Sequence, residues 1–318
     1  MTVLVANCVV DTISCMERRS RDKSISTGKT IRITEPRIKV LEALQTHGML
    51  PTNYLAVAAD KSVDYMRNHV LKDMFHESTR EYGKLVVRPS GQKRTDVKWN
   101  NYALYALSEN GRQLLFDRGL DQDCIRPSGE VFHQALTSAV TFSIAETCKV
   151  MGIEYIPGHV ILEKCGSFRQ DTYRGPVWVH NGTRLIPDQL FSLKQKDGSV
   201  EVFVVEVDRG TEQTSRTVAS QKSRRKTLQD MFAAYKDYIV GGFYKNHLCI
   251  DSEMYVLNVM TNPGTMANFM DLIPNNDFML FQTVDCFGDE ARTPRKILHQ
   301  LVTEPWLRKG HKSFQIPQ

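Results

Sequence analysis

The sequence of 318 residues lacks the features of a secreted, a zinc-binding or a membrane-spanning protein. Its seven cysteines are scattered and no two have CxxC spacing, so a reduced protein without a structural zinc site is expected. No window reaches about 18 apolar residues, the length of a membrane span. Basic residues follow the apolar start MTVLVANCVV, whereas a secretory signal has them before it. We therefore expect a cytoplasmic protein.

The sequence also lacks a strong charge of either sign. Its formal net charge of +5 does not by itself indicate a nucleic-acid partner, so the distribution of the charges decides that question. Hydrophobic residues make up 41% of the chain, which is enough for a large core. At roughly 150 residues per domain, the length predicts two domains.

The first half has the order of elements of a winged helix-turn-helix. Residues 1–33 are interpreted as a leader or arm, and a solvated leader is favoured over an arm that contacts phosphates. A domain of residues 34–120 follows. Caps, apolar stripes and glycine stops predict helices at 34–48 and 52–59 and a third that begins after Asp60 and has an apolar side from Val63 to Met74. Strands are predicted at 84–89 and 102–108, and a fourth helix at 108–119.

Basic residues of this half gather on the third helix and on the hairpin. Major-groove entry by the helix and phosphate contact by the wing would use such residues. A winged helix that contacts a protein, with a lysine-rich loop for solubility, is the alternative. The residues predicted to contact double-stranded DNA are Arg67, Asn68, Lys72, Lys84, Arg88, Lys93, Arg94 and Lys98.

The second half reads as a mixed sheet flanked by helices, which gives an α/β (α+β) fold class. A polar linker at 121–130 precedes a domain of residues 131–318. Helices are predicted at 133–151, 217–240, 265–272 and from 293 onward. Strands are predicted at 153–163, 184–193, 200–208, 254–261 and 278–284.

Three carboxylates fall at the ends of two neighbouring strands. Glu206 and Asp208 are two residues apart, so they point to the same face of a strand, and a hairpin would bring Asp188 beside them. Converging acids are costly unless a cation or a basic partner neutralises them. This cost makes the stretch 184–212 the leading candidate for a functional site.

Both halves together resemble the replication-relaxation family of plasmid and phage proteins. The resemblance covers residues 34–245 and rests on four features: YALSENG at 105–111, a helix opening with His133, the pair Pro187–Asp188, and EVDRGTE at 206–212. It implies a winged helix followed by a domain related to the PD-(D/E)xK phosphodiesterases.

The resemblance also implies a chemistry for the acids. Asp188 and Glu206, joined by Asp208, would hold Mg²⁺ or Mn²⁺, which lowers the pKa of an attacking water. The superfamily has a lysine two residues after the glutamate, where this chain has Asp208. Lys222 is one candidate for a migrated catalytic lysine, although its helix face more readily suits solvent or phosphate. Alternatively, Arg209 and Glu212 form salt bridges with Asp208 and leave a relic without metal.

Three functions stay open from the residues. One is a DNA-binding endonuclease of a plasmid, phage or integrated element, and another is a regulator whose degenerate nuclease-like domain serves homodimerisation or partner docking. A third is an enzyme of RNA or nucleotide ends. Two tyrosines of the long helix, Tyr235 and Tyr238, are expected to pack in the core, and His133 taken alone reads as a structural histidine.

Overall fold

The computed structural model describes residues 23–89, 103–120, 131–164, 178–180, 183–209, 227–284 and 296–316, and every structural statement below concerns these residues. Five of the predicted functional residues lie outside them: Lys93, Arg94, Lys98, Glu212 and Lys222. The predicted α/β (α+β) class is confirmed, with helices around a three-stranded sheet and a mixed five-stranded sheet.

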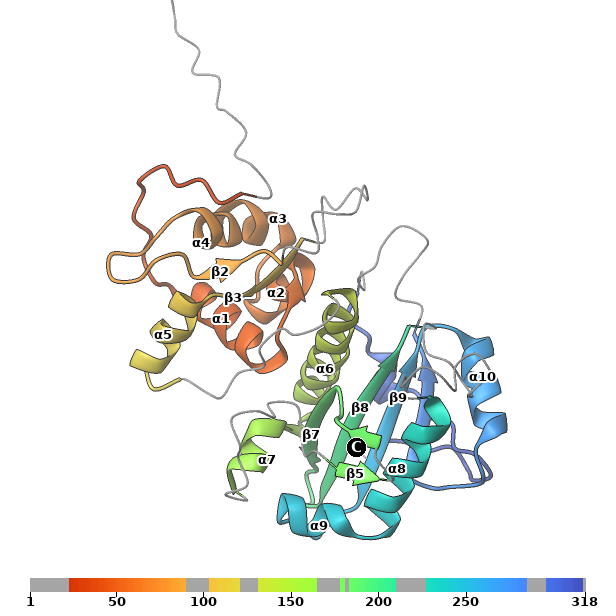
Figure 1. Ribbon diagram of the computed structural model, residues 1–318. Coiled ribbons are helices and arrows are strands. Elements are labelled where there is room, and N and C mark those ends of the chain that lie inside the picture. The colour runs from red at the N-terminus through yellow and green to blue at the C-terminus, as the bar shows by residue number, and fades with distance from the viewer. Residues whose placement is uncertain are drawn as a thin grey trace, which may run out of the picture.

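Helices and a small antiparallel sheet build the first half (Figure 1). Its elements are α1 (Glu35–His47), β1 (Leu50–Pro51), α2 (Thr52–Ala58), α3 (Val63–Tyr65), η1 (Met66–Leu71), α4 (Lys72–His76), β2 (Val86–Val87), β3 (Leu104–Leu107) and α5 (Glu109–Asp117). Strand β3 lies between β1 and β2 and pairs antiparallel with both. The side chain of Ser108 accepts a hydrogen bond from the backbone N–H of Gly111 and so caps α5.

The third predicted helix is one continuous run, α3–η1–α4, with a π-helical middle. Ser62 caps it, and Met66, Val70, Leu71 and Met74 are its buried side. A π segment is rare and is frequent at functional sites. The π segment leaves Met66, Val70 and Met74 on the buried side and Asn68 and Lys72 exposed.

The second half is built around the larger sheet. Its elements are α6 (Val131–Met151), β4 (Glu154–Pro157), α7 (Gly158–Lys164), β5 (Trp178–His180), β6 (Thr183–Leu185), β7 (Gln189–Lys194), β8 (Val200–Asp208), α8 (Leu228–Val240), α9 (Phe243–Leu248), β9 (Met254–Met260), α10 (Pro263–Leu272), β10 (Met279–Thr283) and α11 (Gln300–Thr303). The strand order is β10-β9-β8-β7-β4, parallel from β10 to β8 and antiparallel from β8 to β4.

Alternation along β8 divides this sheet into two apolar faces. Val202 and Val204 pack with α8 and α10, while Phe203, Val205 and Val207 pack with α6 and α11. Strands buried on both faces read as continuous apolar runs, which is how the sequence VEVFVVEV appears. The acids Glu206 and Asp208 continue the face that α8 covers.

Two predicted strands are wrong in extent. The run 153–163 is strand only to Pro157, the last residue paired with β7, and continues as α7 from Gly158, which packs directly on the Leu190 carbonyl. The run 184–193 is divided into β6 and β7. Pro187, which has no N–H for a ladder, lies in the gap between them.

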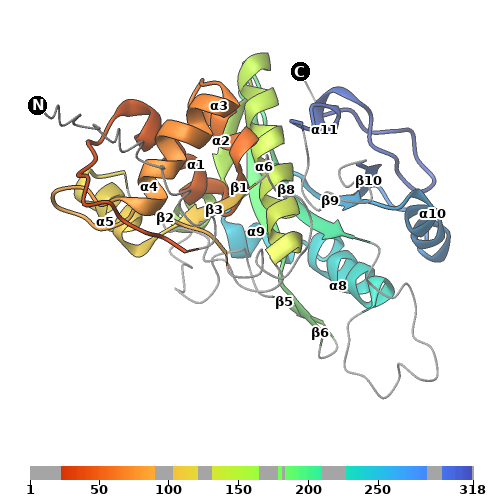
Figure 2. The same cartoon turned by 90° about the horizontal axis from the view of Figure 1, so that it is seen from above.

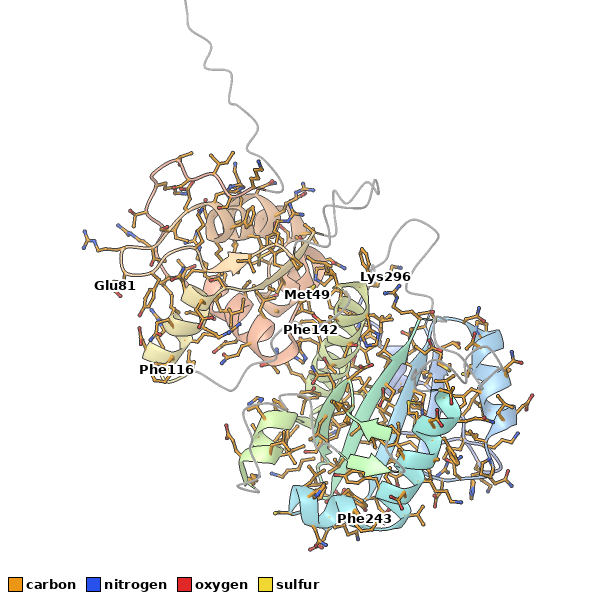
Figure 3. The ribbon with its side chains drawn as sticks, viewed as in Figure 1. Met49, Glu81, Phe116, Phe142, Phe243 and Lys296 are labelled. Atoms are coloured by element: carbon orange, nitrogen blue, oxygen red, sulfur yellow. The ribbon has the colours of Figure 1, made fainter. Side chains whose placement is uncertain are left out.

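Helix α6 connects the two halves. Its Ala139 and Phe142 belong to the core of the first half, while Leu136 and Val140 belong to the core of the second. Figure 2 shows α6 between α1 and β8, and Figure 3 places Phe142 at the junction. The predicted linker 121–130 lies outside the described residues, so the domain boundaries stay a prediction.

A histidine is buried at this junction. His47 of α1 lies with Nδ1 3.0 Å from Oγ1 of Thr141, and its ring contacts Phe142 and Tyr155. Burial lowers the pKa of His47 from 6.5 to about 3. The folded protein therefore holds His47 neutral where the unfolded chain takes up a proton.

Acid should weaken the fold through His47. Because its folded pKa is depressed, the stabilisation is complete above pH 6.5 and is lost as the pH falls toward 3. Between pH 7.5 and 5 the free energy of unfolding of the wild type should fall by about 2 kcal/mol more than that of His47→Phe. Urea unfolding of both proteins at the two pH values measures this, and equal losses would contradict it.

Candidate functional site

Asp188 is the best-connected acid of the predicted site. It lies just before β7, and its backbone N–H bonds to the Val205 carbonyl of β8. The two carboxylate oxygens have different partners: Oδ1 lies 2.9 Å from Nε2 of His133, and Oδ2 accepts the backbone N–H of Val207 at 2.9 Å. His133 is in the first turn of α6, so a helix and a strand fix this carboxylate from two sides.

Glu206 lies on β8 and is held from the face of the sheet that α8 covers. Its Oε1 accepts a hydrogen bond of 2.5 Å from the hydroxyl of Tyr235 on α8. Tyr235 is fully buried, and burial followed by the charge of Glu206 raises its pKa well above the usual value, with a smaller contribution from Asp188. The phenol therefore remains a protonated donor, and both carboxylates act on it.

Asp208 ends β8 and is 6% exposed. It lines a pocket with Glu206, and the rest of the lining includes Asn258 of β9 and apolar side chains of α8 and α10, among them Leu228, Met231 and Phe269. Among the described residues that line the pocket there is no lysine or arginine. The basic group that the phosphodiesterase resemblance requires is thus not supplied by this part of the wall.

The placement of the acids does not fit a ready-made metal centre. In the described part of the chain, no group of three or more histidine, cysteine, aspartate or glutamate side chains is placed to hold a metal ion. Both oxygens of Asp188 and one oxygen of Glu206 already accept protein hydrogen bonds. The assignment of Asp188, Glu206 and Asp208 as metal ligands stays a prediction, and so does the catalytic role of these acids.

The predicted DNA-contact residues of the third helix lie at its surface. Asn68 and Lys72 are exposed, while the guanidinium of Arg67 forms an ion pair of 2.6 Å with Asp64 one turn earlier. At the base of the hairpin, Lys84 is half-buried, and the Arg88 guanidinium lies 5.5 Å from the centre of the Tyr105 ring. The structure therefore leaves Asn68 and Lys72 as the most accessible of these groups.

Sequence reasoning missed several contacts. Tyr65 and His69 are exposed beside Asn68, and their rings lie 5.3 Å apart, but apolar periodicity gives no reason to single them out. Tyr235 was expected to pack in the core, as it does, but its hydroxyl also reaches Glu206. A buried tyrosine needs a partner for its hydroxyl, and this rule would have pointed to an acid.

Family comparison matches residues 41–247, about two-thirds of the chain, to the replication-relaxation family. The chain belongs to the replication-relaxation family. The resemblance inferred from the residues is thereby confirmed, and the family's description links the chain to replication. No curated protein and no solved structure matches it.

The replication-relaxation match covers both candidate regions, the helix 63–76 and the acids Asp188 and Glu206. It begins inside α1 and ends inside α9, so the segment before α1 and the strands β9 and β10 lie outside it. Among the described residues, no helix is both long enough and apolar enough to cross a membrane.

Removing the Tyr235 hydroxyl tests how the acids are held. Tyr235→Phe leaves a charged acceptor without this donor, so the free energy of unfolding should fall by about 1–3 kcal/mol. Tyr244→Phe is the matched control, because its hydroxyl bonds to the neutral carbonyl of Ser252 and its loss should cost about 0.5–1.5 kcal/mol. Urea unfolding at neutral pH compares them, and a Tyr235 loss no larger than the control's would contradict the charged contact.

Proposed function

We propose that this chain is a DNA-binding replication protein of a plasmid, phage or integrated element, in which the first half binds duplex DNA as a winged helix. The carrying observation is the arrangement of that half. Three helical runs precede the strands β2 and β3, and β1, which follows the first run, joins the same sheet. The third run exposes Asn68, His69 and Lys72. A helix of this kind fits a major groove, and the hairpin beside it fits the adjacent backbone.

For the second half we propose a nuclease-like scaffold that does not cleave. Its order of elements, from α6 through β4, β7, β8 and α8 to β9, supports a relation to the PD-(D/E)xK fold. The pocket beside Glu206 has Asp208 where the superfamily has its lysine, and the acids are held by His133, a backbone N–H and Tyr235. Such a domain would serve homodimerisation or partner docking during replication.

Metal-dependent nicking is the second candidate, and one observation favours it. Asp188, just before β7, lies beside Glu206 of β8, because Gln189 pairs with Val205, and both carboxylates act on the same tyrosine hydroxyl. Two acids placed in this way would bind Mg²⁺ or Mn²⁺, which would activate water and screen a phosphate, if the hydrogen bonds that hold them rearranged. Double-stranded DNA is the proposed substrate, with RNA as the alternative polymer.

The DNA-contact proposal predicts a specific change in salt dependence. Lys72→Ala should weaken binding to duplex DNA and lower the slope of log affinity against log salt by about one, because one phosphate contact is lost. Lys149→Ala removes another exposed charge, from α6, and should change neither value. Fluorescence anisotropy with a labelled duplex across a salt series measures both, and an unchanged slope for Lys72→Ala would refute this contact.

Cleavage and metal binding separate the two candidates for the second half. With supercoiled plasmid and millimolar Mg²⁺ or Mn²⁺, we expect no nicking by the wild type and no saturable heat in metal titration calorimetry. Asp188→Ala and Glu206→Ala are the controls. Nicking by the wild type that both substitutions abolish would replace the scaffold with an endonuclease.

A further inference from the structure

Ion pairs lie near both ends of the third helical run, α3–η1–α4. Close to its start, Asp64 pairs with the guanidinium of Arg67 at 2.6 Å. Close to its end, Asp73 pairs with Lys29 at 3.0 Å and with Arg37 at 2.8 Å. The two acids of the run would repel a phosphate backbone, and cations of the protein itself offset both of them.

The exposed surface between these ion pairs is built from few charges. From residue 65 to residue 72, the exposed side chains are those of Tyr65, Asn68, His69 and Lys72. Lys72 supplies a cation, whereas the other three supply rings and hydrogen-bonding groups. Asn68 and His69 belong to the π-helical segment, a form that is rare and is frequent at functional sites. Such a surface suits base edges, which are read by hydrogen bonds and apolar contacts.

Two rings of this surface support each other. Tyr65 and His69 are four residues apart, their ring centres lie 5.3 Å apart, and the ring planes are inclined by 33°. Tyr65 is 44% exposed, so much of its ring surface is accessible to a ligand. A side chain that a neighbouring ring already restrains loses less conformational entropy on binding. The Tyr65–His69 pair is therefore an apolar contact surface that is ordered in advance.

Asn68 lies beside this pair, one residue before His69 and three after Tyr65. Its amide combines a donor with an acceptor, and adenine presents the matching acceptor and donor in the major groove. The thymine of the same base pair presents a methyl group, which apolar side chains contact. Arginine commonly reads guanine, but Asp64 engages the guanidinium of Arg67. The chemistry of this helix surface therefore favours A·T pairs over G·C pairs.

We propose that the third helical run selects A·T pairs in the major groove, where Asn68 hydrogen-bonds adenine and the Tyr65–His69 pair contacts the methyl group of thymine. The inference rests on the proposed binding of duplex DNA. Lys72 contributes a phosphate contact, which is independent of sequence. Affinity and base preference are thus divided between different side chains of one helix, so they can be measured separately.

The main experiment compares labelled duplexes of equal length by fluorescence anisotropy at one salt concentration, with the full chain. The wild type should bind an alternating A·T duplex at least about fivefold more tightly than an alternating G·C duplex. Asn68→Ala should lose most of this preference, while Lys72→Ala should weaken binding to both duplexes and keep their ratio. Equal binding by the wild type, or a preference for G·C, refutes base selection, and DNA binding stands if Lys72→Ala is weakened. If the wild type binds neither duplex, both proposals fail.

Modified bases test the two contacts one at a time. Deoxyuridine in place of thymidine removes the methyl group, and 7-deaza-adenine removes the ring-nitrogen acceptor, while neither changes the minor groove. The wild type should bind the deoxyuridine duplex about fourfold more weakly than the thymidine duplex. Tyr65→Ala should bind these two alike, whereas Tyr65→Phe, which keeps the ring, should keep the difference.

The adenine contact has its own expected result with the same probes. The wild type should bind the 7-deaza-adenine duplex at least about fivefold more weakly than the unmodified one. Asn68→Ala should bind these two alike and still distinguish thymidine from deoxyuridine. A methyl effect that Tyr65→Ala retains, or a ring-nitrogen effect that Asn68→Ala retains, would overturn the role given to that side chain.

Discussion

Burial of helix α6 on two sides is the constraint on which both halves depend. Phe142 packs into the core of the first half and Val140 into the core of the second, so most of the helix surface is covered. Its buried hydroxyls would be costly without partners. Thr137, Ser143 and Thr147 each donate to the backbone carbonyl four residues earlier, which satisfies them inside the helix.

The same helix carries the groups that connect it to both regions of interest. His133 in its first turn contacts Asp188, and Thr141 contacts His47 of α1. Eight residues separate His133 from Thr141, which is about 12 Å along the axis. The acids and the proposed DNA-binding half are thus placed by one rigid element, so the orientation of one is fixed relative to the other.

Hydrogen bonds from protein groups hold the acid cluster in place. The Asp188 carboxylate contacts the His133 ring nitrogen and accepts the backbone N–H of Val207. Glu206 accepts the hydroxyl of Tyr235, whose pKa is raised well above its usual value by burial and by the Glu206 charge. Hydrogen bonds to the charged form stabilise it. These hydrogen bonds are the observation that supports the proposed scaffold over the proposed nuclease.

Local patterns could predict the elements but not these long-range contacts. Apolar alternation in 200–208 and the two-residue spacing of Glu206 and Asp208 correctly place both acids on one face. The contact of Tyr235 with Glu206 depends on how α8 crosses the sheet, which periodicity cannot show. The strand predicted at 153–163 failed because apolar runs suit both strand and helix, and Pro157–Gly158 decides between them.

Glu77 shows the same limit at the other end of the molecule's first half. A lone glutamate after a helix is ordinarily a solvated charge, and a polar leader rich in serine and threonine is ordinarily disordered. The two are satisfied only together, because the hydroxyls of Ser26 and Thr27 and the N–H of Thr27 replace the water that Glu77 loses on burial.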